Sequence, residues 1–436
     1  MPETTDSEQD GQHMNNTEFL QQVVAGATPS IDEFVDALGD RFSLLREYQS
    51  TLQNCEWDAE GNLHIQTGMV LTEVYKILQS EATHLNRERR LSLILGALFH
   101  DIYQPITRQN PEIEKKIGVR AQQHDVSKGR SYLALKLMGL DLPYSVVETS
   151  LSLVAYHHEP KRLVTENKPA GEYHRIARLS DPELLYWLEL ANIRGRECPD
   201  RQQLEIVEKY GLYAQKYQAW QSFGADYQSW RAYFNRELAN WNQDTRDLVF
   251  AQAIARYEAG KIFAPESELA RSYSYRDAFP QVVITFGVSG SGKSTWIEHH
   301  LGDHTVISLD ALRIKIASCR KDQSQNSRVV QVAREQLKTR LRSQSKIVWD
   351  ATSLKYDFRH QVISLSRQYG ALITLVIFHC PETIYLERNR QRRHSIPEEV
   401  LLQQLQSLEF PELDEGDRTL IVDEHGNTLA TYGTCY

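Results

Sequence analysis

The chain has 436 residues, of which 41% are hydrophobic and 25% are charged. This composition is typical of a soluble globular protein and excludes a fibrous or largely disordered chain. A domain spans roughly 150 residues, so we expect two or three domains. No hydrophobic run approaches the roughly 18 to 20 residues of a membrane span, and the acidic, polar N-terminus is unlike a secretory signal. We therefore expect a cytoplasmic protein without a membrane partner.

The charge is spread unevenly along the chain. The net charge of −9 argues against binding of nucleic acid by the whole surface. Residues 313–393, however, contain 17 Lys or Arg and 6 Asp or Glu, which makes this stretch strongly basic. We expect an anionic partner there. The five cysteines are far apart and form no Cys-x-x-Cys pair, which argues against a disulfide framework or a cysteine zinc site.

The first half of the chain shows only helical patterns. Ser30 and Glu33 predict a capping box at the start of an amphipathic helix. Further helices are predicted in residues 67–78, 90–99, 132–138, 146–156 and 184–191. From residue 281, short β-rich runs alternate with helical stretches, which predicts a parallel sheet covered by helices. The strands are expected at 282–286, 305–308, 346–349, 371–378 and 419–422.

These patterns predict a multidomain protein with an all-α N-terminal domain and a C-terminal α/β domain. The expected boundaries are a disordered tail at 1–15, the helical domain at 16–202, a helical connector at 203–280 and the α/β domain at 281–436.

The helical half contains a series of histidines that could ligate metal. They are His64, His100, His124, His157 and His158, and Asp101 directly follows His100. Imidazole and carboxylate groups from different helices suit divalent transition metals such as Mn²⁺, Ni²⁺ or Co²⁺, and one carboxylate can bridge two cations. We therefore expect one or two metal ions in this half.

The later part of the helical half offers weaker candidates. Asn192 is a candidate ligand only through the resemblance to HD phosphohydrolases described below, and a neutral amide holds a divalent cation less tightly than a carboxylate does. Asp181 is the alternative, although its place before Pro182 favours a helix N-cap. Arg196 lies one helical turn beyond Asn192 and could bind a substrate phosphate or form a surface ion pair.

The first β-rich run leads into a phosphate-binding loop with the pattern GxxxxGK[ST]. Backbone amides of this loop approach phosphates, Lys293 reaches the outer phosphates, and Ser294 can hold Mg²⁺. The expected cofactors are therefore ATP or another NTP together with Mg²⁺. The predicted binding residues are Gly287, Ser289, Gly290, Ser291, Gly292, Lys293, Ser294 and Thr295.

Five later residues are candidates for the transfer reaction. Asp310 follows the second strand, where it could take a proton from an acceptor hydroxyl or only cap the helix expected from Ala311. Arg313 lies one helical turn further on, and Asp350 ends the third strand at a position that could orient Mg²⁺ or serve structure alone. Arg388 and Arg392 are four residues apart, so we expect them on one helical face, clamping phosphates as part of a lid.

These motifs resemble the polynucleotide 5′-hydroxyl kinase family over residues 281–415. The resemblance is carried by the phosphate loop together with Ser308–Arg313, Asp350–Thr352 and Arg388–Arg392. It implies that Asp310 is the general base, that Arg313 contacts a phosphate of the acceptor strand, and that Arg388 and Arg392 belong to the lid.

The order H…HD…H…HH in the first half resembles the HD phosphohydrolase superfamily. The resemblance implies that His64 and His100 bind one metal, that His124 and either His157 or His158 bind the other, and that Asp101 bridges them. Two positions depart from the pattern. Asn192 stands where these proteins usually have Asp, and Gln104 replaces a Lys of related end-healing enzymes.

The two halves in this order resemble bacterial HD-Pnk end-healing enzymes. That resemblance implies ATP-dependent phosphorylation of 5′-hydroxyl ends and metal-dependent removal of 2′,3′-cyclic, 2′- or 3′-phosphates from RNA ends. The partners would be RNA or DNA ends, and an RNA ligase would act downstream. Two alternatives stay open: an active kinase with an HD-like binding module, and a small-molecule kinase with a regulatory HD domain.

Overall fold

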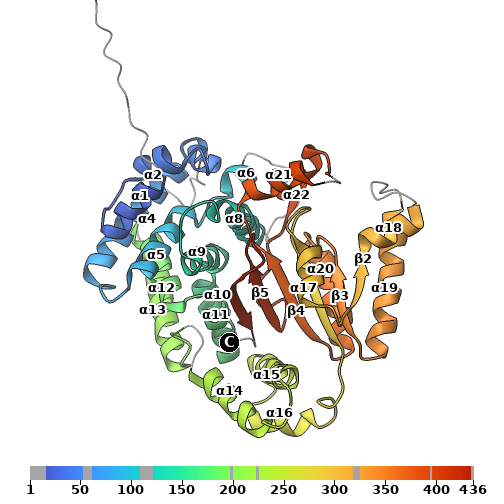
Figure 1. The fold of residues 1–436 in the computed structure, drawn as a ribbon. Coiled ribbons are helices and arrows are strands. Elements are labelled where there is room, and N and C mark those ends of the chain that lie inside the picture. The colour runs from blue at the N-terminus through green and yellow to red at the C-terminus, as the bar shows by residue number, and fades with distance from the viewer. Residues whose placement is uncertain are drawn as a thin grey trace, which may run out of the picture.

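The computed structural model describes residues 16–52, 61–108, 121–196, 200–221, 225–317, 325–392 and 395–433, and gives only the backbone of 121–126, 225–226 and 317. The predicted tail at 1–15 lies outside the described residues. Helices fill the first part of the chain, and a sheet with covering helices fills the last part (Figure 1). The predicted fold class is confirmed.

The N-terminal half is a bundle of helices. The predicted capping box is present: the Ser30 side chain accepts a hydrogen bond from the amide of Glu33, and the Glu33 carboxylate accepts one from the amide of Ser30. The first helices of the bundle are α1 (Asn16–Ala25), α2 (Ile31–Leu38), α3 (Ser43–Arg46), α4 (Leu63–Ser80), α5 (Arg87–Phe99), α6 (Gln104–Arg108) and α8 (Ala121–Leu137). They are followed by α9 (Tyr144–Tyr156), α10 (Glu159–Thr165), α11 (Ala170–Leu179) and α12 (Pro182–Arg194).

Helix α5 is the centre of this bundle. Every residue from Leu91 to Phe99 is buried, as expected for a helix that is covered on all sides. It packs against α4, α9 and α12. Helix α5 ends at His100 and α9 ends at His157, so the packing of these two helices brings two histidines together in the interior.

Four helices lead from the bundle to the sheet: α13 (Arg201–Lys216), α14 (Ala225–Glu237), α15 (Gln243–Glu258) and α16 (Pro265–Ser272). Helix α13 packs against α10 and α12 and shares the bundle core. The other three surround a smaller core of their own that contains Tyr227, Trp230 and Phe250. Helix α15 touches both α11 and the sheet.

The sheet has the order β2-β3-β1-β4-β5-β6, with β1 to β5 parallel and β6 antiparallel to β5. Its strands are β1 (Gln281–Phe286), β2 (Thr305–Ser308), β3 (Lys346–Asp350), β4 (Leu372–Phe378), β5 (Arg418–Val422) and β6 (Thr428–Gly433). The accompanying helices are α17 (Lys293–His300), α18 (Leu309–Ala317), α19 (Asn326–Arg342), α20 (Tyr356–Gln368), α21 (Glu382–Gln391) and α22 (Glu398–Ser407). The five predicted strands are confirmed, and β6 was missed.

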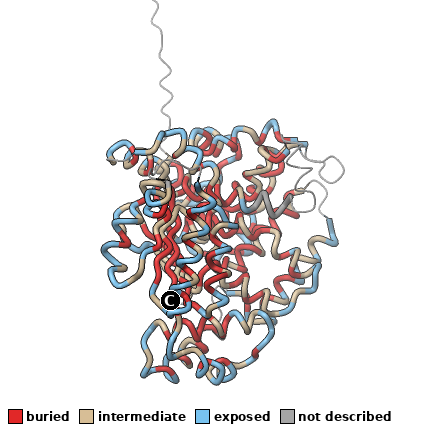
Figure 2. The backbone as a smooth tube through the Cα atoms, turned by 90° about the vertical axis from the view of Figure 1, so that its right-hand side faces the viewer, coloured by how far each residue is buried: buried red, intermediate tan, exposed pale blue. Residues whose placement is uncertain are grey.

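Alternation along β1 places hydrophobic side chains on both faces of the sheet. Val282, Ile284 and Phe286 belong to the large core shared with the helical half, whereas Val283 packs in a second core with Trp296 of α17. The buried backbone in Figure 2 accordingly runs through the centre of the molecule. Helices therefore cover both faces, as the alternating sequence pattern predicts.

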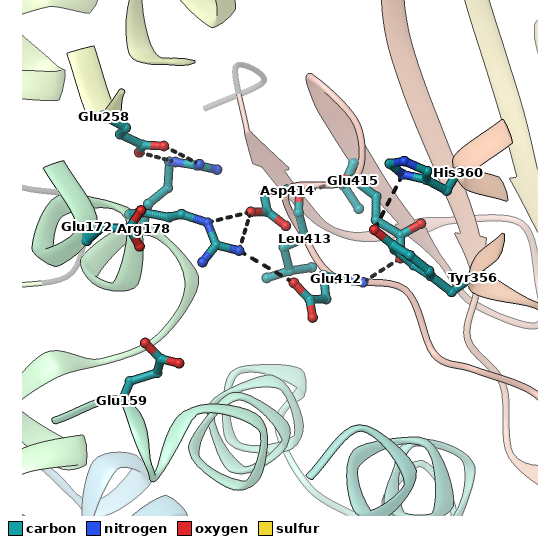
Figure 3. A network of polar contacts seen from close by, with 12 residues as sticks. Glu159, Glu172, Arg178, Glu258, Tyr356, His360, Glu412, Leu413, Asp414 and Glu415 are labelled. Atoms are coloured by element: carbon teal, nitrogen blue, oxygen red, sulfur yellow. Dashed lines mark hydrogen bonds and ion pairs between the residues drawn. The ribbon is translucent and has the colours of Figure 1, made fainter. Parts of the chain in front are cut away.

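The helical half and the sheet are joined by polar contacts as well as by the shared core. Arg175 on α11 donates to Asp414, which precedes β5, at 2.9 Å. On the same helix Arg178 pairs with Glu258 of α15 at 2.9 Å (Figure 3), and α15 in turn touches β4. The buried ring of His379, which follows β4, is another link. Its Nε2 donates to the carbonyl of Ala134 at 2.8 Å, and its Nδ1 accepts from the hydroxyl of Tyr144 at 2.9 Å.

Over the part of the chain that the structure describes, no helix combines the length and apolar character needed to cross a bilayer.

Candidate functional site

The phosphate-binding loop lies between β1 and α17. Gly290 and Gly292 have φ angles of 90° and 98°, a left-handed conformation that glycine adopts without the cost of a Cβ atom. The amide of Gly287 donates to the carbonyl of Thr352 at 3.1 Å, which ties the loop to the segment after β3. Ser294 and Thr295 are exposed in the first turn of α17. The loop therefore opens onto the positive end of a helix.

Lys293 lies inside the loop. Its Nζ donates to the carbonyls of Gly287 at 2.8 Å and Val288 at 2.9 Å, and to Ser291 Oγ at 3.1 Å. Burial lowers the pKa of Lys293 to about 8, although the negative charges of Asp350 and Asp310 act in the opposite direction. Both predicted acidic residues thus lie close enough to the loop lysine to affect its protonation.

Asp310 and Arg313 form an ion pair beside this loop. Arg313 Nη1 donates to Asp310 Oδ1 at 2.6 Å, and Arg313 Nε donates to Asn326 Oδ1 of α19 at 3.2 Å. Helix α18 begins at Leu309, so Asp310 lies inside its first turn and is not its N-cap. Asp310 is exposed, as a residue that meets an acceptor hydroxyl must be.

Arg388 and Arg392 both lie over the loop, but not on one helical face. Arg388 donates to the carbonyls of Ser291, at 3.3 Å, and Glu424. Helix α21 ends at Gln391 and Arg392 has extended backbone, so the expectation of a shared helical face is wrong. Arg392 nevertheless reaches the loop. If Gly290 carried a Cβ atom, that atom would lie 4.0 Å from Arg392 Nη1.

A glutamine from α22 also contacts the loop, and no motif indicated this contact. Gln404 Oε1 accepts a hydrogen bond from the amide of Ser289 at 2.9 Å. Helices α21 and α22 pack against each other, so together they cover one side of the loop. A covering pair of helices in this position is the arrangement expected of a lid.

The second candidate site is a buried group of histidines around Asp101. One ligand atom from each of Asp101, His157 and His158 lies within 4.8 Å of the others. His100 Nε2 lies 3.1 Å from Asp101 Oδ2, and His157 Nε2 lies 3.9 Å from Asp101 Oδ1. The structure thus brings together four of the predicted metal ligands.

The histidine rings are oriented as metal ligands are. His100 Nδ1 contacts the carbonyl of Ala97 at 2.9 Å, and His157 Nδ1 contacts that of Val154 at 3.0 Å. A carbonyl only accepts, so each Nδ1 is the donor and each Nε2 is directed toward Asp101. Neither Nε2 makes a hydrogen bond to the residues that the structure describes. A hydrogen bond from Nδ1 to a backbone carbonyl fixes the tautomer and the orientation of a ligating imidazole.

The protonation states of His157 and His158 also fit a metal site. Burial lowers the pKa of His157 well below its ordinary value, with a further contribution from His158, and burial lowers the pKa of His158 to about 4. Both rings are therefore neutral at neutral pH, which is the state that binds a cation. Two imidazoles with a carboxylate suit a first-row divalent metal.

Three predicted residues lie at or beyond the edge of this group. His64 Nε2 pairs with Asp32 Oδ1 at 3.0 Å, and its ring does not belong to the triad of Asp101, His157 and His158. The side chain of His124, on α8, lies outside the described residues. The role of both histidines as ligands stays a prediction. Asn192 is 8% exposed on α12, and its Oδ1 has no hydrogen-bond partner among the described residues.

Asp181 is the N-cap of α12, as the sequence predicts. Its carboxylate accepts from the amides of Glu183 and Leu184 at 3.1 Å and pairs with Arg89 at 2.9 Å. These contacts use its oxygens for structure, so it is not a metal ligand here.

Arg196, Gln104 and Lys161 lie in the same helical half as the histidines. Arg196 lies near enough to Glu189 to lower its pKa. Gln104 begins α6, directly after the turn that follows Asp101. Lys161 is exposed on α10, and its charge reaches both His158 and Glu189. No motif in the sequence pointed to Lys161.

Two family profiles match separate parts of the chain. An HD domain profile matches residues 71–182, which include His100, Asp101 and His157, and an AAA domain profile matches residues 282–411, which include the phosphate loop. Among solved structures, a gluconokinase from Sinorhizobium meliloti 1021 is 27% identical over 34% of this chain and 83% of its own, with a TM-score of 0.27. A search of curated proteins gave no match. The chain therefore contains an HD domain followed by a P-loop domain of the AAA kinase-like type, which matches the architecture of an HD and kinase fusion.

Proposed function

We propose that the chain is a cytoplasmic, bifunctional enzyme that heals broken nucleic-acid ends. Its P-loop half phosphorylates 5′-hydroxyl ends with ATP, and its HD half removes 2′,3′-cyclic, 2′- or 3′-phosphates from RNA ends. The observation that carries this proposal is the pairing of Asp310 with Arg313 beside Lys293. Asp310 would act as the base, and Arg313 is a cation suited to bind a phosphate of the acceptor strand. Both lie next to the phosphate-binding loop that would hold ATP.

In the kinase half, each side chain has a task that follows from its position. Asp310 takes the proton of the acceptor hydroxyl while that oxygen attacks the γ-phosphorus and the bond to ADP breaks. Lys293 neutralises charge on the outer phosphates, and Ser294 holds Mg²⁺. Arg388 and Arg392, which lie over the loop, stabilise the charge that develops on the transferred group.

In the HD half, His100, Asp101, His157 and His158 would hold a divalent cation. A cation there would act as a Lewis acid on the phosphoryl group and lower the pKa of a water molecule. Lys161 and Arg196 orient the substrate phosphate from the edge of the site. The resulting ends, a 5′-phosphate and a free 3′-hydroxyl, are those that an RNA ligase joins.

The test of this function is a pair of assays on the full chain. Incubation with ATP and a 5′-hydroxyl oligonucleotide should transfer one phosphate, and incubation with Mn²⁺ and an RNA ending in a 2′,3′-cyclic phosphate should release phosphate. Transfer to a polyol but not to the oligonucleotide would support a small-molecule kinase. Transfer without phosphate release would support the kinase with an HD-like binding module.

Arg313→Ala is expected to weaken binding of the acceptor strand more than binding of ATP. One phosphate contact is lost, so the slope of log affinity against log salt should fall by roughly one. Oligonucleotide titrations at several salt concentrations measure this. The matched control is Arg342→Ala, at the far end of α19. Equal acceptor affinity in wild type and Arg313→Ala would contradict the assigned role.

ATP affinity is expected to fall as the pH rises through about 8, where Lys293 loses its proton. The phosphates favour the ammonium form, so the affinity is full below the pKa of the free protein and declines above it. Fluorescence titrations from pH 6.5 to 9.5 measure the profile. Lys293→Arg retains its charge in this range and should give a flat profile. A flat wild-type profile would contradict the prediction.

A further inference from the structure

Helix α12 carries a buried carboxylate that neither the sequence motifs nor the proposed mechanism uses. Glu189 is 4% exposed, and its Oε2 makes no hydrogen bond to any residue that the structure describes. Burying an ionised carboxylate is costly unless a cation or hydrogen bonds compensate it. The position of Glu189 therefore requires an explanation.

The neighbours of Glu189 point to the histidine site. Asn192, one helical turn further along α12, hydrogen-bonds to the Glu189 carboxylate, and its amide nitrogen must be the donor because a carboxylate only accepts. The charges of Lys161, Arg196 and His100 also act on Glu189 and lower its pKa, against the effect of burial. Helix α12 packs directly against α5 and α9, the two helices that end at His100 and His157.

Four buried polar atoms in this region share one property. His100 Nε2, His157 Nε2, Glu189 Oε2 and Asn192 Oδ1 have no hydrogen-bond partner among the described residues. All four side chains belong to residues that are less than a tenth exposed. Two imidazole nitrogens and two oxygens without partners are atoms of the kind that a divalent transition metal binds.

We propose that Glu189 is a metal ligand and supplies the negative charge that Asn192 lacks. The Asn192 amide nitrogen holds the Glu189 carboxylate in place, while Glu189 Oε2 binds the cation on the His100 side of Asp101. Affinity for a divalent cation rises with the charge of its ligands. The neutral residue at position 192 therefore does not leave the site weak, because a carboxylate from the preceding turn takes its role.

Metal titration without substrate tests this inference. Metal-free wild-type protein, Glu189→Gln and Glu183→Gln are titrated with Mn²⁺ and followed by calorimetry and by the paramagnetic resonance signal of free Mn²⁺. Glu183 lies in the first turn of the same helix and binds Arg89 and His84, so it is the matched control. Glu189→Gln should weaken Mn²⁺ binding by tenfold or more, whereas Glu183→Gln should bind as the wild type does. Equal affinity of Glu189→Gln and wild type would overturn the proposal.

A second test uses the wild-type protein alone, so its result does not depend on whether Glu189→Gln folds. In crystals soaked with Mn²⁺, the anomalous signal should place the cation about 2.2 Å from a Glu189 oxygen. A cation that contacts Asn192 but not Glu189 would overturn the proposal. The inference rests on the HD half of the proposed function, yet its readout is separate. Mn²⁺ bound by Glu189 in a protein that releases no phosphate would support the ligand and contradict the proposed phosphoesterase.

Discussion

Asp310→Asn is expected to slow phosphate transfer severely while ATP binding stays within about twofold of the wild type. The amide keeps the shape of the side chain and can still contact Arg313, but it cannot accept the proton of the attacking hydroxyl. A general base contributes roughly 10² to 10⁴ in rate, so turnover should fall by that factor. Transfer of labelled phosphate to a 5′-hydroxyl oligonucleotide measures the rate, and nucleotide titration measures ATP binding.

The control is Asp357→Asn, an exposed carboxylate in the first turn of α20 of the same half. Its turnover should equal that of the wild type. Near-normal turnover of Asp310→Asn would show that another group takes the proton, and the assignment of Asp310 would be wrong.

Asp101→Ala is expected to remove bound metal and to silence the HD half. Asp101 contacts His100 and lies within ligand distance of His157 and His158, so its loss removes the only carboxylate of that described triad. Phosphate release from cyclic-phosphate RNA should fall by roughly three orders of magnitude, or about 4 kcal/mol of activation free energy. Elemental analysis of the purified protein should show the loss of metal, and the kinase rate should stay unchanged because its residues lie in the other half.

Asp141→Ala is the matched control, since Asp141 is exposed between α8 and α9 and lies in the same half. It should keep both metal and phosphate release. A wild-type protein that binds no divalent cation and releases no phosphate would instead identify the HD half as a binding module.

The sequence predicted the parts of both sites that are written in contiguous motifs. The phosphate loop is local, because one strand, its glycines and one helix terminus create it, and Lys293 follows from the pattern. His100 and His157 were found because each ends a hydrophobic helix. Residues whose role depends on distant packing were not found. Gln404 reaches the loop across more than a hundred residues, and Glu189 becomes relevant only because α12 packs against α5 and α9.

Two errors in the prediction have identifiable structural causes. Arg392 and Arg388 have helical spacing, but α21 ends between them, and end positions depend on the contacts of the following segment. Strand β6 was missed because residues 428–433 are only partly buried or exposed, so they lack the hydrophobic alternation of an inner strand. Antiparallel pairing with β5, which the sequence pattern does not show, places these residues in the sheet.

The position of His379 limits how the two activities can be separated. Both of its ring nitrogens are bonded to the helical half, and burial lowers its pKa to about 4, so the ring is a neutral bridge and not an exchangeable surface contact. Cutting the chain before β1 would leave this ring, together with the carboxylate of Asp414, without its partners. In an isolated kinase half, the buried ring of His379 next to β4 would therefore lack both of its hydrogen bonds. Each reaction should therefore be assigned with point substitutions in the intact chain and not with excised halves. A domain exchanged with that of a relative would also need the residues that contact it in the other half.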